Sequence, residues 1–222
     1  PDEFTEIVEV VVEESEIEEG YVKIIVTRGS DDHNFTIPAR SALQPNVLVY
    51  GKPIDLNAIE KVQSGVNCIT LDDDRGHHCD ILSLNQLNNM MARAEAQKKN
   101  CYDAVFIKDG LLTEASHSNV CIVKAGVIWT PATNEHMIRG VTRSLVLTRA
   151  APSAGVTSID EASEPVRFED MMTAEEVFLT NSQDGIIPVL SIDGNPIGGG
   201  KVGDVTKKIQ EHYAHLMEDG LP

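Results

Sequence analysis

Apolar and polar residues follow two different rhythms along the first fifty residues. Isoleucine and valine recur among carboxylates in residues 2–19, "DEFTEIVEVVVEESEIEE", at a spacing that predicts an amphipathic helix. We interpret its carboxylates as a solvated face in preference to an acidic interaction segment. The β-branched runs "GYVKIIVTRG" and "NVLVY" predict strands, and Gly51 and Pro53 then break the pattern. We therefore expect two domains, residues 1–51 and 52–222.

The second domain alternates between short apolar runs and helical periodicity, which predicts an α+β fold. A helix is expected from about Leu84 to Lys99, capped by Ser83 or Asn85, with Leu84, Leu87, Met91 and Ala94 on its apolar face. Four runs between 101 and 131 predict an antiparallel meander with turns at Asp109-Gly110 and Gly126. Further helices are expected at 141–151, 168–174 and 205–218, and further strands at 67–74, 176–180 and 186–192.

Composition narrows the possible partners and location. Hydrophobic residues make up 41% of the 222, enough for a core, and the formal net charge of -17 disfavours nucleic acid and anionic membranes. No apolar run approaches the roughly 20 residues of a membrane span. The four cysteines are far apart and indicate neither a disulfide framework nor a zinc site, so we expect a cytoplasmic protein. The chain starts at Pro1, almost inside a helix, and we expect that its true beginning is missing.

Two features suggest chemistry on physical grounds. Gly140 precedes a predicted helix whose opening amides, at Val141 and Thr142, are unpaired donors that suit a phosphate, although a glycine there can also be a simple turn. Glu114 lies in a strand-like run before the small polar residues "ASHSN". It suits a general base, a metal ligand or the partner of a protonated ring nitrogen, and the alternative is an edge-strand glutamate facing water.

A third polar break, Thr180–Gly185, directly follows an apolar strand, where either ligand contacts or an ordinary connector would lie. Two other motifs carry no site. "GGGKV" lacks the spacing of a nucleotide-binding loop. The residues of "HHCD", at 77–80, would alternate between opposite faces of an extended chain, so we predict no metal.

Five segments, taken in order, carry a family resemblance. They are "CDILSLN", "NCYDAVFIKDGLLTEASHSNVCIVKAGVIWTP", "MIRGVTRSLVL", "EVFLTNSQDGIIPVLSIDG" and "GKVGDVTKKIQ". Together they resemble the class IV, or fold type IV, pyridoxal-phosphate enzymes, which include D-amino-acid and branched-chain aminotransferases and aminodeoxychorismate lyase. The resemblance implies a two-domain fold with an incomplete N-terminal domain, a homodimer, and pyridoxal 5'-phosphate (PLP) as cofactor.

The resemblance also implies roles for individual residues. Glu114 would accept the pyridinium N–H of PLP, keeping the ring able to withdraw electrons. Val141 and Thr142 would hold its phosphate at the helix start. Asn181 and Ser182 would lie beside the phosphate and the substrate carboxylate. The opposite wall would be shaped by the segment from Ser116 to Asn119, including Ser118.

Leu82 departs from the family pattern, which has the Schiff-base lysine at this position. An alkyl side chain cannot form that bond or move a proton, and losing a positioned acid-base group alone costs about 10²–10⁴ in rate. The leucine is a natural loss, a deliberate knock-out, or a cofactor-bound lysine recorded as leucine. Because Glu114, Thr142 and the Asn181-Ser182 pair remain, the sequence favours a site still built for catalysis.

The expected reaction is amino transfer between an amino acid and a 2-oxo acid. The alternatives are an aminodeoxychorismate lyase, which treats one shared carbanion differently, and a non-catalytic PLP-binding pseudoenzyme. The segment after "TRG" has His33 and Phe35 about where D-amino-acid enzymes have Arg and His for the substrate carboxylate, so D-amino-acid specificity is an open expectation.

Overall fold

The structure is a computed structural model that describes residues 2–29, 44–156, 159–160 and 165–219. His33 and Phe35 lie outside these residues. The chain divides into two compact units, Pro1–Leu56 and Asn57–Pro222. The boundary expected after Gly51 falls inside a strand, and the interpretation of the first unit as part of a small domain stays a prediction.

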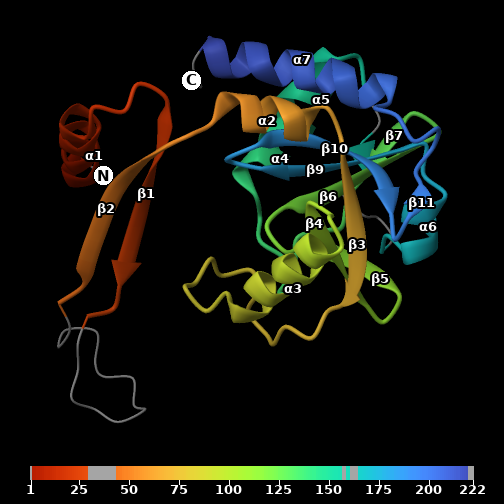
Figure 1. The fold of residues 1–222 in the computed structure, drawn as a ribbon, viewed down its shortest axis with the longest axis horizontal. Coiled ribbons are helices and arrows are strands. Elements are labelled where there is room, and N and C mark those ends of the chain that lie inside the picture. Colours follow the sequence, from red (N-terminus) through yellow and green to blue (C-terminus); the bar gives the residue numbers. More distant parts are fainter. Residues whose placement is uncertain (1, 30–43, 157–158, 161–164, 220–222) are drawn as a thin grey trace. The chain divides into compact units, whose positions relative to one another are not determined.

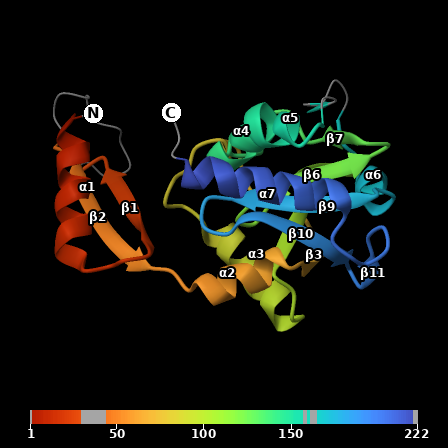
Figure 2. The same cartoon turned by 90° about the horizontal axis from the view of Figure 1, so that it is seen from above.

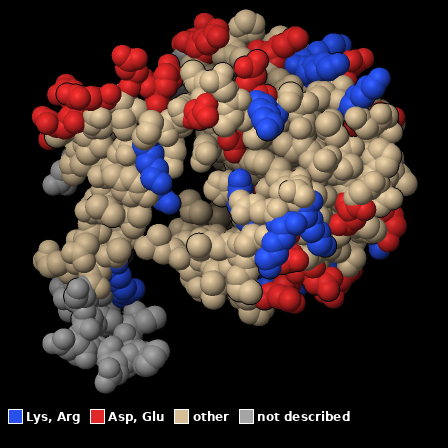
Figure 3. Space-filling model, viewed as in Figure 1, with Lys and Arg blue, Asp and Glu red and all other residues tan. Residues whose placement is uncertain are grey.

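The first unit contains helix α1 (Asp2–Ser15) and strands β1 (Gly20–Thr27) and β2 (Asn46–Pro53) (Figure 1). The two strands pair antiparallel from Gly20 opposite Pro53 to Thr27 opposite Asn46. The pattern break expected at Gly51 is therefore wrong, because Gly51 pairs with Val22 and Pro53 ends the strand, where proline is tolerated. Acidic side chains gather over α1 (Figure 3), as expected for a solvated face.

The second unit is built on a mixed sheet. Nine strands of the described chain form it, eight of them in the order β5-β4-β3-β10-β9-β6-β7-β8, with β11 paired to β10. They are β3 (Val66–Asp72), β4 (Asp103–Lys108), β5 (Leu111–Ala115), β6 (Asn119–Lys124), β7 (Val127–Trp129), β8 (Ile159–Asp160), β9 (Glu176–Asn181), β10 (Gly185–Ile192) and β11 (Asn195–Pro196). Strand β3 runs parallel to β4 and β10, whereas β4-β5, β6-β7, β6-β9 and β9-β10 are antiparallel.

The antiparallel meander expected between 101 and 131 is wrong. The structure contains two hairpins, β4-β5 and β6-β7. The backbone has positive φ angles at the turns, Asp109-Gly110 and Ala125-Gly126. In the sheet, however, β5 and β6 are not neighbours, because β4, β3, β10 and β9 lie between them. Local turn signals predict which strands form hairpins, but the long-range pairing of β6 with β9 separates the two hairpins.

Helices cover the sheet of the second unit (Figure 1). They are α2 (Leu56–Gln63), α3 (Leu87–Lys98), α4 (Val141–Leu145), the π-helical turn η2 (Val146–Ala150), α5 (Ala151–Ser153), α6 (Phe168–Met172) and α7 (Asp204–Glu218). Seen from above, α7 lies across β9 and β10 (Figure 2), and α3 packs against β3 and β4. The expected helix at 141–151 is one helical segment that continues to Ser153 through the π-helical turn.

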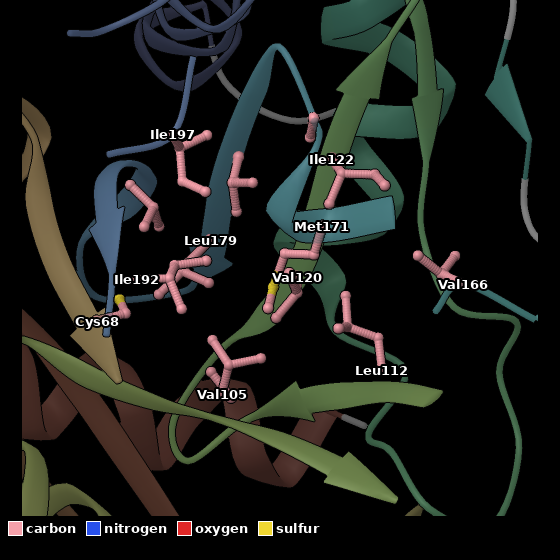
Figure 4. Close-up of a cluster of buried hydrophobic side chains, with 14 of the residues drawn as sticks. Cys68, Val105, Leu112, Val120, Ile122, Val166, Met171, Leu179, Ile192 and Ile197 are labelled. Carbon is pink, nitrogen blue, oxygen red and sulfur yellow. The ribbon is translucent and has the colours of Figure 1, made fainter. Parts of the chain in front are cut away.

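The main core lies between the strands of the sheet and α6 (Figure 4). Val120, Ile122 and Leu179 from β6 and β9 are fully buried there, and Met171 from α6 packs against them. Burying each of these side chains contributes about 1.5–3 kcal/mol relative to leaving it in water. The strands that carry the candidate residues are therefore firmly anchored.

Helix α3 differs from its prediction in its start and in its buried face. It begins at Leu87 after Gln86, without a side-chain cap, and Ser83 instead accepts a hydrogen bond from the Asn85 N–H. Ala92 and Ala96 are its buried residues, because small side chains let the helix lie close to β3 and β4. The apolar residues expected to face the core point to solvent instead: Leu84, Leu87, Met91 and Ala94.

No helix in the described part of the chain is both long and apolar enough to cross a bilayer. The cysteines are free thiols, with Cys68 and Cys121 buried and Cys79 and Cys101 partly exposed.

Candidate active site

Glu114 lies near the end of β5 and is only 5% exposed. The alternative of an edge-strand glutamate facing water is therefore wrong. Although β5 ends the sheet, the Glu114 carboxylate is covered by Arg75 from the segment after β3 and by the backbone at Ile138. A buried carboxylate needs hydrogen-bond partners or an opposite charge, and this one has both.

Three donors of the described chain hold the Glu114 carboxylate. Arg75 Nη1 lies 2.5 Å from Oε1, and Oε2 accepts hydrogen bonds from the Ile138 N–H at 2.9 Å and Asn119 Nδ2 at 3.3 Å. A carboxylate offers about four acceptor positions. Oε1, which carries one of these bonds, can therefore accept one more donor.

Burial dominates the electrostatics of Glu114. Burial raises the pKa of its carboxyl from 4.5 to about 7, although the hydrogen bond and charge of Arg75 and the Ile138 N–H oppose the rise. Glu114 therefore exchanges its proton near neutral pH. A bound cation would favour the charged form, so the carboxylate suits a positively charged N–H.

Asn119 connects Glu114 to the start of α4. Its amide also donates to the Ile138 carbonyl at 2.8 Å, and a Cβ added to Gly140 would collide with its Oδ1 atom. Gly140 is the N-cap of α4 and supplies no side-chain cap, so the opening amides of the helix depend on partners from elsewhere. Thr142 is buried and Val141 is 67% exposed. Glu114 and this helix start thus lie on either side of one asparagine.

The side chain of Asn181 closes a turn. Its Oδ1 accepts hydrogen bonds from the backbone of Gln183 at 3.0 Å and Asp184 at 2.7 Å, and its amide donates to Ser118 Oγ at 3.1 Å and Tyr102 Oη at 3.2 Å. The structure therefore brings Asn181 and Ser118 together, whereas Ser182 is exposed. The binding roles expected for these three residues stay predictions.

Leu82 lies in the non-helical segment between β3 and α3, and 78% of its surface is exposed. Its neighbours Ile81 and Ser83 line a cavity of about 170 Å³ that also contacts Arg75 and Glu114. Leu82, Thr142 and Asn181 are not among the described residues that line it. Both sequence neighbours of position 82 thus line the cavity, while the leucine side chain itself faces solvent.

Comparison with known proteins identifies the family. The family described as amino-transferase class IV matches residues 1–192. The chain belongs to the class IV aminotransferases. D-alanine aminotransferase of Staphylococcus aureus strain N315 is 32% identical over 217 residues, which cover 98% of this chain and 75% of the relative.

Solved structures of other class IV proteins have the same fold. The branched-chain aminotransferase of Escherichia coli matches 97% of this chain and 71% of its own, with a TM-score of 0.83 and 24% identity. A putative 4-amino-4-deoxychorismate lyase of Legionella pneumophila covers 96% and 76%, with a TM-score of 0.78 and 19% identity. These likenesses confirm the expected fold type IV, and the class IV enzymes depend on PLP.

Arg75 contacts Glu114, and the sequence motifs do not single it out. It follows "DDD" at the carboxyl end of β3, a parallel strand, where polar side chains commonly serve a site. The motifs do not single out Thr113 either, which is adjacent to Glu114 and whose hydroxyl donates to Asp73 at 2.8 Å. The position of these residues after or within buried strands is the signal that could have identified them.

Proposed function

We propose that the native protein is a PLP-dependent aminotransferase that moves an amino group between an amino acid and a 2-oxo acid. The observation that carries the proposal is the Glu114 carboxylate, which is buried, held by three donors and able to accept a fourth. A pyridinium N–H is a donor of the right charge for that position. When bound, PLP supplies an electron-withdrawing ring and carries the amino group between substrates.

The residues of this chain have distinct tasks in the proposal. Glu114 holds the ring proton, and the amides of Val141 and Thr142 with the Thr142 hydroxyl hold the phosphate. Asn119 supports both regions, because it contacts the Glu114 carboxylate and leaves no room for a side chain at Gly140. Ser118, Asn181 and Ser182 form the neighbouring wall.

Leu82 limits what the chain as written can do. Leucine cannot bond to the cofactor or exchange a proton with the substrate, so we expect noncovalent PLP binding and amino transfer slowed by at least about 10²–10⁴. A lysine at position 82 would supply both functions. The cavity lined by Ile81 and Ser83 beside Glu114 supports this position as the attachment point.

Restoring the lysine tests the proposal. Leu82→Lys is expected to bind added PLP, to absorb in the visible range, and to retain the cofactor on the chain after borohydride reduction, as read by intact mass. Leu84→Lys is the matched control, because Leu84 is also exposed, at 67%, and does not line the cavity within the described chain. Equal retention by the two variants, or no PLP binding by Leu82→Lys, would refute the proposal.

The reaction is tested on Leu82→Lys with several donors. D-alanine with a 2-oxo acid is the first pair, because a D-alanine aminotransferase is the 32% identical relative, and branched-chain L-amino acids are the second. Aminodeoxychorismate tests the lyase alternative through pyruvate release. Activity only with aminodeoxychorismate would replace the transaminase assignment. A homodimer and a cytoplasmic location complete the proposal, and sizing of the native protein tests the dimer.

A further inference from the structure

Arg75 lies between two buried carboxylates in the second unit. Its Nη1 contacts Glu114 at 2.5 Å, while Nε and Nη2 contact Asp73 at 2.9 and 2.8 Å. The side chains of Arg75 and Glu114 are each 6% exposed, and that of Asp73 is 1% exposed. An arrangement of this kind is strong because the charged hydrogen bonds are shielded from water.

The guanidinium is fixed from several directions. The two contacts to Asp73 form a fork that holds its plane, and Nη2 also donates to the His136 carbonyl at 2.9 Å. The Phe106 ring lies under it, with 4.3 Å between the guanidinium carbon and the ring centroid. Arg75 therefore cannot turn away from Glu114 without losing its contacts to Asp73. A lysine could not reproduce the fork, because its single ammonium has no fixed plane.

We infer that Arg75 is a positioning residue: anchored on Asp73, it keeps the Glu114 carboxylate charged and oriented so that Oε1 can accept a cationic N–H. This inference deepens the proposed function and rests on it. The three side chains carry one positive and two negative charges, so the cluster has a net charge of about -1 when all are ionised. One bound pyridinium would neutralise it.

The pKa shifts of the surrounding titratable groups agree with Asp73 as the anchor of Arg75 and Glu114 as the carboxylate that Arg75 keeps charged. Although burial opposes it, the hydrogen bonds and charge of Arg75 lower the pKa of Asp73, so Asp73 stays charged. Burial raises the pKa of Glu114 to about 7, and the negative charge of Asp73 adds to that rise. The Cys79 thiol also lies near the cluster, but partial burial raises its pKa, so it adds no charge at neutral pH. Arg75 is thus the group that opposes protonation of Glu114 most strongly.

The first measurement needs no cofactor. The carboxyl carbon of Glu114 is titrated by NMR in the native chain, in Arg75→Gln and in Arg75→Lys. The native midpoint is expected near pH 7. Arg75→Gln should raise it by about one to three pH units, because an opposite charge at this distance has an effect of that size, and Arg75→Lys should raise it less.

Arg93→Gln is the matched control. Arg93 is a partly buried arginine on α3 whose guanidinium lies 4.9 Å from the centroid of the Tyr102 ring, and it makes no described contact to Glu114. Its substitution should leave the Glu114 titration unchanged. An unchanged titration in whichever Arg75 variant folds, judged by circular dichroism, would overturn the inference.

Noncovalent PLP binding at pH 8 separates this inference from the proposed function. A rise of about two pH units in the Glu114 midpoint would lower its charged fraction, and so the affinity, about tenfold. Native affinity in Arg75→Gln, with the titration unmoved, would refute the role of Arg75 and leave the aminotransferase proposal intact. A raised titration in a protein that binds no PLP would support the role of Arg75 on Glu114 and refute the cofactor site.

Discussion

Ser118 and Asn181 share a side-chain hydrogen bond of 3.1 Å although they are 63 positions apart. The pairing of β6 with β9 places Asn119 opposite Thr180, so the residues next to each meet at the same end of the sheet. Asn181 also binds the backbone of Gln183 and Asp184, which forms the turn into β10. This one amide therefore ties the β5-β6 connection to the β9-β10 connection.

Asn181→Ala is expected to lower the free energy of unfolding by about 2–3 kcal/mol, because it leaves the buried Asp184 N–H without its acceptor and the buried Ser118 hydroxyl oxygen without its amide donor. Chemical denaturation followed by circular dichroism measures this difference. Ser182→Ala is the control, since Ser182 is exposed and should change stability by less than about 0.5 kcal/mol. Equal midpoints for the two variants would show that the amide does not hold the turn.

Gly140→Ala is expected to disturb Asn119 and, through it, Glu114. The φ angle of Gly140 is -64°, so alanine is acceptable to the backbone, but its Cβ would collide with Asn119 Oδ1. Overpacking of this kind costs about 1–3 kcal/mol. The variant should also bind PLP more weakly, because Asn119 donates to the Glu114 carboxylate.

Gly199→Ala provides the comparison for Gly140→Ala. An added Cβ at Gly199 meets nothing within 4 Å, so alanine there should leave both the denaturation midpoint and PLP affinity unchanged. If Gly140→Ala behaves in the same way, Asn119 moves freely and does not connect Glu114 to the helix start.

The stability of the chain should depend on pH through Glu114. Its folded pKa is raised from 4.5 to about 7, so its stabilising contribution is complete below about pH 4.5 and is lost as the pH rises through 7. Glu114→Gln removes this titration. The free energy of unfolding of the native chain, relative to Glu114→Gln, should therefore fall by on the order of 3 kcal/mol between these pH values.

Denaturant titrations at several pH values, with and without the substitution, measure this difference. The difference in unfolding free energy between the native chain and Glu114→Gln should no longer change with pH above about pH 8, where Glu114 is charged in both the folded and the unfolded chain. A difference that stays constant from pH 4.5 to 8 would mean that Glu114 is not desolvated as described.

Local patterns predicted most of the elements and the resemblance predicted the family. The amphipathic helix at the N-terminus, both hairpins and the final helix formed where periodicity and turn residues indicated. Periodicity could not decide which face of α3 is buried. The sheet accepts the small residues Ala92 and Ala96, and a hydrophobicity pattern gives more weight to Leu87 and Met91.

The sequence could predict individual residues of the candidate site, but not the contacts between them. Sequence motifs and the physics of helix ends predict Glu114 and the helix start at Val141 as candidate residues. Arg75 as the partner of Glu114 depends on the pairing of β3 with β4 and of β4 with β5, and Asn119 as the neighbour of the helix start depends on how the segment at Ile138 returns to it. Such pairings join residues that no local spacing relates.

Leu82→Lys should change chemistry without changing stability. Leu82 is 78% exposed and lies outside any helix or strand, so replacing it should alter the free energy of unfolding by less than about 0.5 kcal/mol. Leu112→Lys, at a site only 4% exposed, should be strongly destabilising because it buries an unpaired charge. Thermal and chemical denaturation of the three proteins test this contrast. If Leu82→Lys is instead as destabilised as Leu112→Lys, the leucine packs in the native protein, and any gain in cofactor retention could not be assigned to the amine alone.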